Sequence, residues 1–84
     1  MSTIKEIEMR LIKRFLPVQL LVADDSHLHV GHAGSKAGGG HYTVTIQAAE
    51  FKTLPRVQIH RLIYASLNDL IPNAIHALQI KILK

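Results

Sequence analysis

The chain contains no cysteine and no tryptophan. Without cysteine it cannot form a disulfide or donate a thiolate to a metal, so any sulfur ligand must come from another molecule. No apolar run approaches the ~18 residues that span a bilayer. The start, Met-Ser-Thr-Ile-Lys-Glu, lacks the basic and apolar regions of a secretory signal. We therefore expect a cytoplasmic protein without a membrane segment.

Glycine is absent from most of the chain and concentrated in one stretch. All 5 glycines lie between Ser26 and His41, together with four of the 6 histidines, His27, His29, His32 and His41. Neutral imidazole is a common metal ligand, and glycine lets a backbone bring distant side chains together. This stretch is the first candidate for a binding site. Its imidazoles could equally belong to a solvated connection that binds nothing.

The 84 residues are enough for one domain with one small core, and 48% of them are hydrophobic. We therefore expect a single domain covering residues 1–84. The formal net charge is +4 and the pI about 9.8, but lysine and arginine are scattered along the chain. This charge permits binding to nucleic acid without requiring it.

Two periodicities divide the first half of the chain. Thr3 and Glu6 have the spacing of a capping box, and an apolar stripe at helical spacing follows until Pro17. From Val18 to the aspartates at 24 and 25 the period is two, which predicts a strand. Residues 42–48 also alternate, with Tyr42, Val44, Ile46 and Ala48 facing inward. The two strands should form a hairpin with a long loop.

The second half predicts one helix and one strand. Pro55 suits the first position of a helix, whose buried stripe is centred on Ile59, Ile63, Leu67 and Leu70 and which ends before Pro72. From His76 the chain alternates again, which puts His76 in phase with Leu78, Ile80 and Ile82. A helical crossover favours a parallel pair of strands. The expected fold is α+β, in the order helix–strand–strand–helix–strand, with a three-stranded mixed sheet and helices on one face.

Several segments together resemble the BolA family. They are Ser26-His-Leu-His29 before the glycines, His41-Tyr-Thr-Val after them, Val57-Gln-Ile-His-Arg-Leu-Ile-Tyr64, and Ile75-His-Ala-Leu78. The resemblance runs from about residue 3 to residue 84. It implies a type II KH-like fold, in agreement with the element order.

The resemblance also implies a partner and a cofactor. BolA-like proteins pair with monothiol glutaredoxins, and the heterodimer holds a [2Fe-2S] cluster between a glutaredoxin cysteine, glutathione and histidine or cysteine of the BolA chain. By position, the family's ligands fall on His29 and His76, with His32, His41 and His27 as substitutes in the loop. The isolated chain is expected to hold no cofactor. A cysteine-free chain can contribute only imidazole to such a cluster.

Other functions remain open. A DNA-binding regulator is the main alternative, because the family includes such proteins and the chain is basic. The turn at residues 52–55 lacks the glycine that is common in the family, which weakens nucleic-acid binding by that route. A zinc site built from His27, His29 and His32 alone is weaker still, because no carboxylate or thiol joins them. We expect no enzymatic activity, because the chain has no cysteine nucleophile and neither Ser26 nor Ser35 has a recognisable acid and base arranged around it. A weak homodimer stays open.

Overall fold

A computed structural model describes residues 2–25 and 40–84. Its elements follow the order α1 (Thr3–Phe15), β1 (Gln19–Asp24), β2 (Gly40–Gln47), a 3₁₀ helix η2 (Ala49–Thr53), α3 (Arg56–Ser66), a 3₁₀ turn η3 (Asn68–Leu70) and β3 (Ile75–Leu83). None of the helices in these residues is long and apolar enough to cross a membrane. The expected element order is confirmed, with two 3₁₀ segments added.

Helix α1 begins one residue earlier than the sequence pattern indicated. Ser2, in extended conformation, is the N-cap, and its hydroxyl accepts a hydrogen bond from the Lys5 backbone N–H. Thr3 is therefore the first helical residue, and the predicted capping box is wrong. The side chain of Glu6 instead binds Arg10 one turn later. The helix ends at Phe15, and the C-cap Leu16 adopts the left-handed conformation (φ 48°) and donates its backbone N–H to the Ile12 carbonyl.

The three strands form one mixed sheet in the order β1–β2–β3. β1 is antiparallel to β2, with Leu20 opposite Ile46, and β3 is parallel to β2. Val18 lies just before β1 and is exposed, so the strand begins one residue later than expected. The predicted inward side of β2 is confirmed, because Tyr42, Val44, Ile46 and Ala48 are all buried.

Helix α3 is shorter than its apolar pattern indicated. Pro55 has an extended ψ and is the N-cap, so the first helical residue is Arg56 and not Pro55 as predicted. The helix ends at Ser66 instead of continuing toward Pro72. The chain then continues as the 3₁₀ turn η3, where the Leu70 N–H donates a hydrogen bond to the Leu67 carbonyl. This 3₁₀ spacing keeps Leu67 buried and Leu70 partly buried, so the apolar pattern continues although the α-helix does not.

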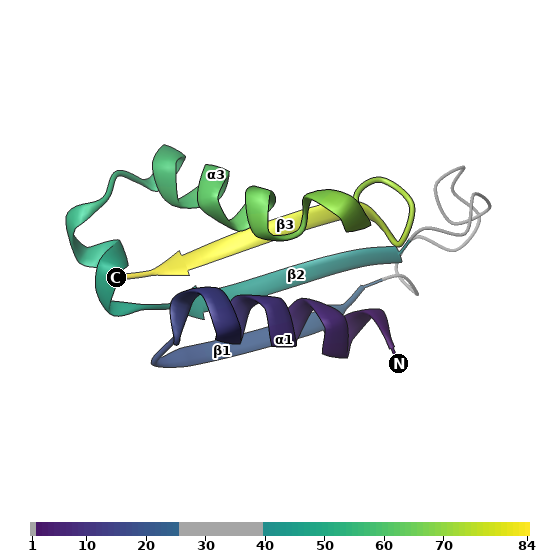
Figure 1. Cartoon of the computed structure of the whole chain (residues 1–84), viewed down its shortest axis with the longest axis horizontal. Coiled ribbons are helices and arrows are strands. Elements are labelled where there is room, and N and C mark those ends of the chain that lie inside the picture. The colour runs from purple at the N-terminus through teal and green to yellow at the C-terminus, as the bar shows by residue number, and fades with distance from the viewer. Residues whose placement is uncertain (1, 26–39) are drawn as a thin grey trace.

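The core lies between the sheet and the helices. Figure 1 shows α1 and α3 on the same face of the sheet, as expected, with the two helices side by side. Fully buried side chains come from every layer: Ile7 and Leu11 of α1, Val44 and Ile46 of β2, Phe51 of η2, Ile59 and Ile63 of α3, Leu67, and Ile75 of β3. The other face of the sheet has no helix over it in the described chain.

Candidate functional site

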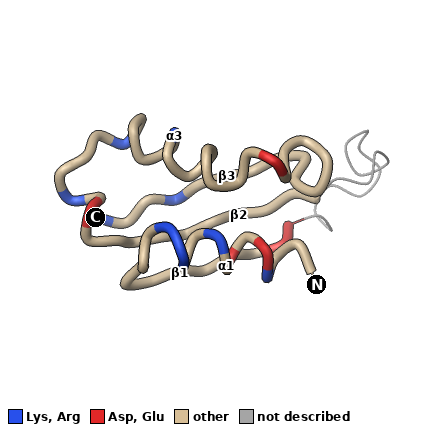
Figure 2. Tube along the Cα trace, in the orientation of Figure 1, with Lys and Arg blue, Asp and Glu red and all other residues tan. Residues whose placement is uncertain are grey.

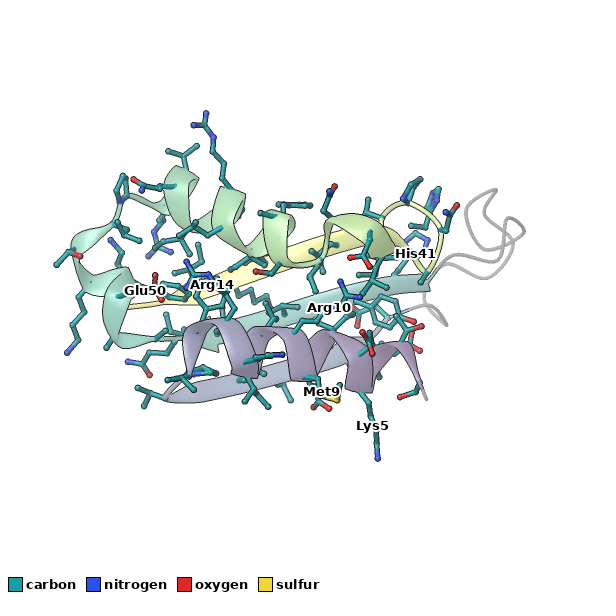
Figure 3. All side chains as sticks on the ribbon, in the orientation of Figure 1. Lys5, Met9, Arg10, Arg14, His41 and Glu50 are labelled. Atoms are coloured by element: carbon teal, nitrogen blue, oxygen red, sulfur yellow. The ribbon has the colours of Figure 1, made fainter. Side chains whose placement is uncertain are left out.

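Two of the predicted ligand histidines meet at one end of the sheet. His41 lies at the start of β2 and His76 at the start of β3, and parallel strands begin at the same edge. The centroids of their rings are 5.4 Å apart, with an angle of 52° between the ring planes. Figure 3 shows His41 at this end of β2, next to the beginning of β3. We call these two side chains the histidine pair.

A bulge in β3 sets the direction of His76. The register with β2 passes from Gly40 opposite Ile75 to His41 opposite Ala77, which leaves His76 as an extra residue in the ladder. Such bulges re-aim a side chain. Here Ile75 is buried and His76 is exposed. The predicted phase of His76 with Leu78, Ile80 and Ile82 is therefore wrong.

A small cavity of about 200 Å³ lies beside the histidine pair, between the ends of the three strands. Its walls include Asp25, His41, Thr43 and Gln79. The Asp25 N–H donates to the His41 carbonyl at 2.7 Å, and the Thr43 hydroxyl donates to the Asp25 carboxylate. These contacts fix the backbone that carries His41. Sequence analysis missed Asp25 and Thr43, because neither belongs to a motif and only the strand register brings them together.

Gly40 allows the backbone to pass close to an aromatic ring at this end of β2. A Cβ added to Gly40 would lie 2.6 Å from Cζ of Tyr42, closer than real Cβ atoms approach other atoms. The Tyr42 side chain is only 8% exposed, so its ring has little room to withdraw. The Gly40 N–H donates to the Ala74 carbonyl at 3.1 Å, which ties β2 to the segment that enters β3.

Charge is unevenly distributed along the molecule. Figure 2 shows most acidic positions toward the end that carries the histidine pair and most basic positions toward the opposite end. Glu6 and Glu8 lie in the first half of α1, Asp24 and Asp25 lie at or just after the end of β1, Asp69 lies in η3, and Glu50 lies in η2. Arg10 pairs with two of these carboxylates, Glu6 and Asp69, so the remaining negative charge toward this end comes from Glu8, Asp24 and Asp25.

The remaining predicted ligands cannot be placed in the same way. His27, His29 and His32 lie outside the described residues, so their prediction as ligands stays a prediction. His60, the remaining histidine of the described chain, is half-buried on α3. Within residues 2–25 and 40–84, no three His, Cys, Asp or Glu side chains are grouped closely enough to hold a metal ion. The described chain therefore offers two neighbouring imidazoles at most.

The fold and this site define a class: a small α+β domain that presents histidine at the open end of a three-stranded mixed sheet. Comparison with known proteins agrees. The profile of the BolA-like protein family matches residues 11–84. The DNA-binding transcriptional regulator BolA of Haemophilus influenzae is 38% identical over 78 residues, which cover 93% of this chain and 73% of the relative.

Solved structures give the same result. BolA1 from Arabidopsis thaliana superposes with a TM-score of 0.83 at 32% identity, covering 98% of this chain and 90% of the other. The BolA domain of SufE1 from the same plant gives 0.83 at 34% identity, covering 98% and 91%. The chain belongs to the BolA-like family, and the predicted family and fold are confirmed.

Proposed function

We propose that this protein is a non-enzymatic adaptor that binds a monothiol glutaredoxin and shares a [2Fe-2S] cluster with it. Its task would be iron–sulfur cluster trafficking or the sensing of iron and thiol status. Membership of the BolA-like family supports the proposal. The observation that carries it is the exposed imidazole of His76, held on a strand bulge at the open end of the sheet.

The available donors fit such a shared cluster. A [2Fe-2S] cluster takes four ligands, and this chain has no cysteine to provide. We assign His76 as the more rigid ligand, because the residues on both sides of it, Ile75 and Ala77, pair with β2. We assign His29 as the second ligand by its position in the family pattern. The glutaredoxin cysteine and glutathione would provide the thiolates. The cluster itself would supply one-electron redox chemistry. Imidazole ligation would make the cluster easier to reduce than thiolate ligation does.

The test is anaerobic assembly with a monothiol glutaredoxin and glutathione, read by visible absorption and circular dichroism. Wild type should give a spectrum distinct from that of the glutaredoxin homodimer. His76→Ala and His29→Ala should return the homodimer spectrum. His60→Ala is the matched control, because His60 lies on α3, away from the histidine pair. A heterodimer spectrum that survives His76→Ala would contradict the proposal.

A DNA-binding regulator is the second candidate. The Haemophilus influenzae relative carries that description in its name. A shallow groove of about 420 Å³ between α1 and the end of α3 is lined by Arg10, Lys13, Arg14 and Ser66. Figure 3 shows the two arginines on the side of α1 that faces α3, whereas Lys5 points away. Arg10 and Arg14 already hold carboxylates, so Lys13 is the cation most available to phosphate.

This candidate predicts a particular salt dependence. DNA affinity should fall steeply with salt, and Lys13→Gln should reduce the logarithmic slope by about one phosphate contact. Lys5→Gln, at the acidic end, should leave the slope unchanged. Equal slopes for wild type and Lys13→Gln would show that this groove is not the DNA-binding surface. DNA binding would become the leading function if no complex with a glutaredoxin formed.

A further inference from the structure

Exposed apolar side chains are concentrated on one side of the molecule. Of the eight exposed large hydrophobic residues in the described chain, five belong to α1, β1 or the turn between them: Met9, Ile12, Leu16, Val18 and Leu21. We call these five the α1–β1 face. Figure 3 shows Met9 on the side of α1 that points away from α3. Apolar surface gathered in this way is typical of a place that another molecule covers.

The free edge of the sheet lies at this face. β1 is an edge strand, because β2 is its only neighbour in the described sheet. The Asp25 N–H donates to the His41 carbonyl, and hydrogen-bonded pairs alternate along an antiparallel ladder. The backbone of Leu21 therefore bonds to β2, whereas the backbone groups of Leu20 and Val22 point away from it. The first five residues of β1 contain no proline and no charge, the usual protection of an edge against pairing.

The charges on α1 indicate which molecule fits. Glu8 directly precedes Met9, and Lys13 directly follows Ile12, so an acid and a base flank the apolar pair symmetrically. Neither charge forms an ion pair within residues 2–25 and 40–84. Against a second α1 in antiparallel orientation, Met9 would meet Ile12 of the second copy and Glu8 would meet its Lys13. The face is therefore complementary to itself, as the interface of a two-fold symmetric dimer must be.

We propose that the chain forms a homodimer in which β1 pairs antiparallel with β1 of a second copy. The outward backbone groups of Leu20 and Val22 bond to those of Val22 and Leu20 across the two-fold axis. Leu21 then lies opposite Leu21 of the second copy, in a pair without hydrogen bonds. Because α1 packs on β1, the same rotation brings the two copies of α1 side by side. One strand and one helix make a small interface, so we expect a Kd of about 10–100 μM.

A single introduced thiol tests the register of this pairing. The chain has no cysteine, so Leu21→Cys would carry the only one. Opposed residues without hydrogen bonds have Cα atoms about 4.5 Å apart, which a disulfide can bridge. Oxidised glutathione, which takes up the two electrons, should therefore cross-link Leu21→Cys at least tenfold faster than Val57→Cys. Val57 is the matched control, because both residues are 61% exposed and Val57 lies on α3.

A charge exchange tests the packing of the two helices. Sedimentation equilibrium from about 10 μM to about 1 mM brackets the expected Kd. Glu8→Lys and Lys13→Glu should each raise the Kd about threefold or more, because symmetry repeats every contact twice. The double variant Glu8→Lys/Lys13→Glu should restore the wild-type value. Far-UV circular dichroism checks that each variant stays folded.

The dimer does not depend on the proposed adaptor function, because the isolated chain is the sample and neither glutaredoxin nor DNA is present. A wild type that stayed monomeric at about 1 mM would overturn the proposal. Equal cross-linking rates for Leu21→Cys and Val57→Cys would overturn it as well, even if a dimer formed, because the copies would then meet through another surface.

Discussion

At the scale of single residues, the Tyr42 ring lies so close to Gly40 that no side chain fits at the start of β2. We expect Gly40→Ala to lower the free energy of unfolding by about 1–3 kcal/mol, because the added methyl group must displace a buried ring. Urea denaturation measures this change. The same substitution in a Tyr42→Leu background should cost less, since the clashing ring is gone. An equal cost in both backgrounds would show that the destabilisation does not come from a clash with the Tyr42 ring.

Ile63 tests the core face of α3. Its side chain is 0% exposed, so Ile63→Ala should cost about 2–5 kcal/mol through lost burial and the cavity left behind. Val57 lies on the same helix and is 61% exposed, which makes Val57→Ala the matched control with a cost within about 0.5 kcal/mol. Chemical denaturation of both variants gives the comparison. A small loss at Ile63 would mean that α3 packs with another face.

Alternation predicted the inward residues of β2 correctly but failed at His76. From Tyr42 in β2 to Ala48 just after it, every second residue is buried, because an unbroken ladder keeps a period of two. In β3 the bulge inserts one residue and shifts the phase, so Ile75 is buried where the pattern placed His76. The apolar sequence around His76 fits either phase, and only pairing with β2 decides between them.

At the scale of elements, two hydroxyl residues at the start of α1, Ser2 and Thr3, differ in their capping role. Ser2→Ala should lower the free energy of unfolding by about 1 kcal/mol, because it removes the acceptor for the Lys5 N–H. Thr3→Ala should cost much less, since Thr3 is already inside the helix and alanine is a better helix former. Thermal or urea unfolding of the two variants gives the answer. The opposite ranking would support the capping box that the sequence suggested.

The ends of elements were harder to predict than their existence. Ser2 and Thr3 are both good capping residues, and the spacing to Glu6 favoured the wrong one because Glu6 pairs with Arg10 instead. At α3 the apolar stripe passes Ser66 without interruption, since η3 keeps Leu67 against the core. Hydrophobic spacing reports which side faces the core. It does not report whether the turn is α or 3₁₀.

At the scale of the whole molecule, the topology followed from the element order. A helix between two strands requires a crossover, which produced the parallel pair β2–β3 and hence the mixed sheet. That same topology brings His41 and His76 together, because parallel strands begin at one edge. The sequence predicted both histidines as candidates, but their contact also needed the register of the bulge, which depends on interactions between distant segments.

One cation joins the two helices across the molecule. The Arg10 guanidinium donates to both carboxylate oxygens of Asp69, with Nη2–Oδ2 at 2.9 Å, while its Nε donates to Glu6 at 2.9 Å. Its Nη1 also donates to the Ser66 carbonyl at 3.4 Å. These bonds link the middle of α1 to the end of α3. The hydrogen bond from Arg10 holds the pKa of the Asp69 carboxyl below its ordinary value of 3.8.

The ion pair between Arg10 and Asp69, here called the clamp, should make the free energy of unfolding depend on pH in a defined direction. Because the pKa of Asp69 is lower in the folded state, its contribution is complete above 3.8 and disappears as the pH falls through the lowered value. Asp69→Asn should therefore reduce the urea midpoint at neutral pH, and the difference from wild type should vanish in strong acid. Glu8→Gln is the control, because it neutralises an α1 carboxylate that forms no ion pair with residues 2–25 or 40–84, and it should show no comparable loss at neutral pH. High salt should shrink the effect of Asp69→Asn, since the pair is solvent-exposed. A difference between wild type and Asp69→Asn that stayed constant into acid would mean that the substitution acts through packing and not through the charge of the clamp.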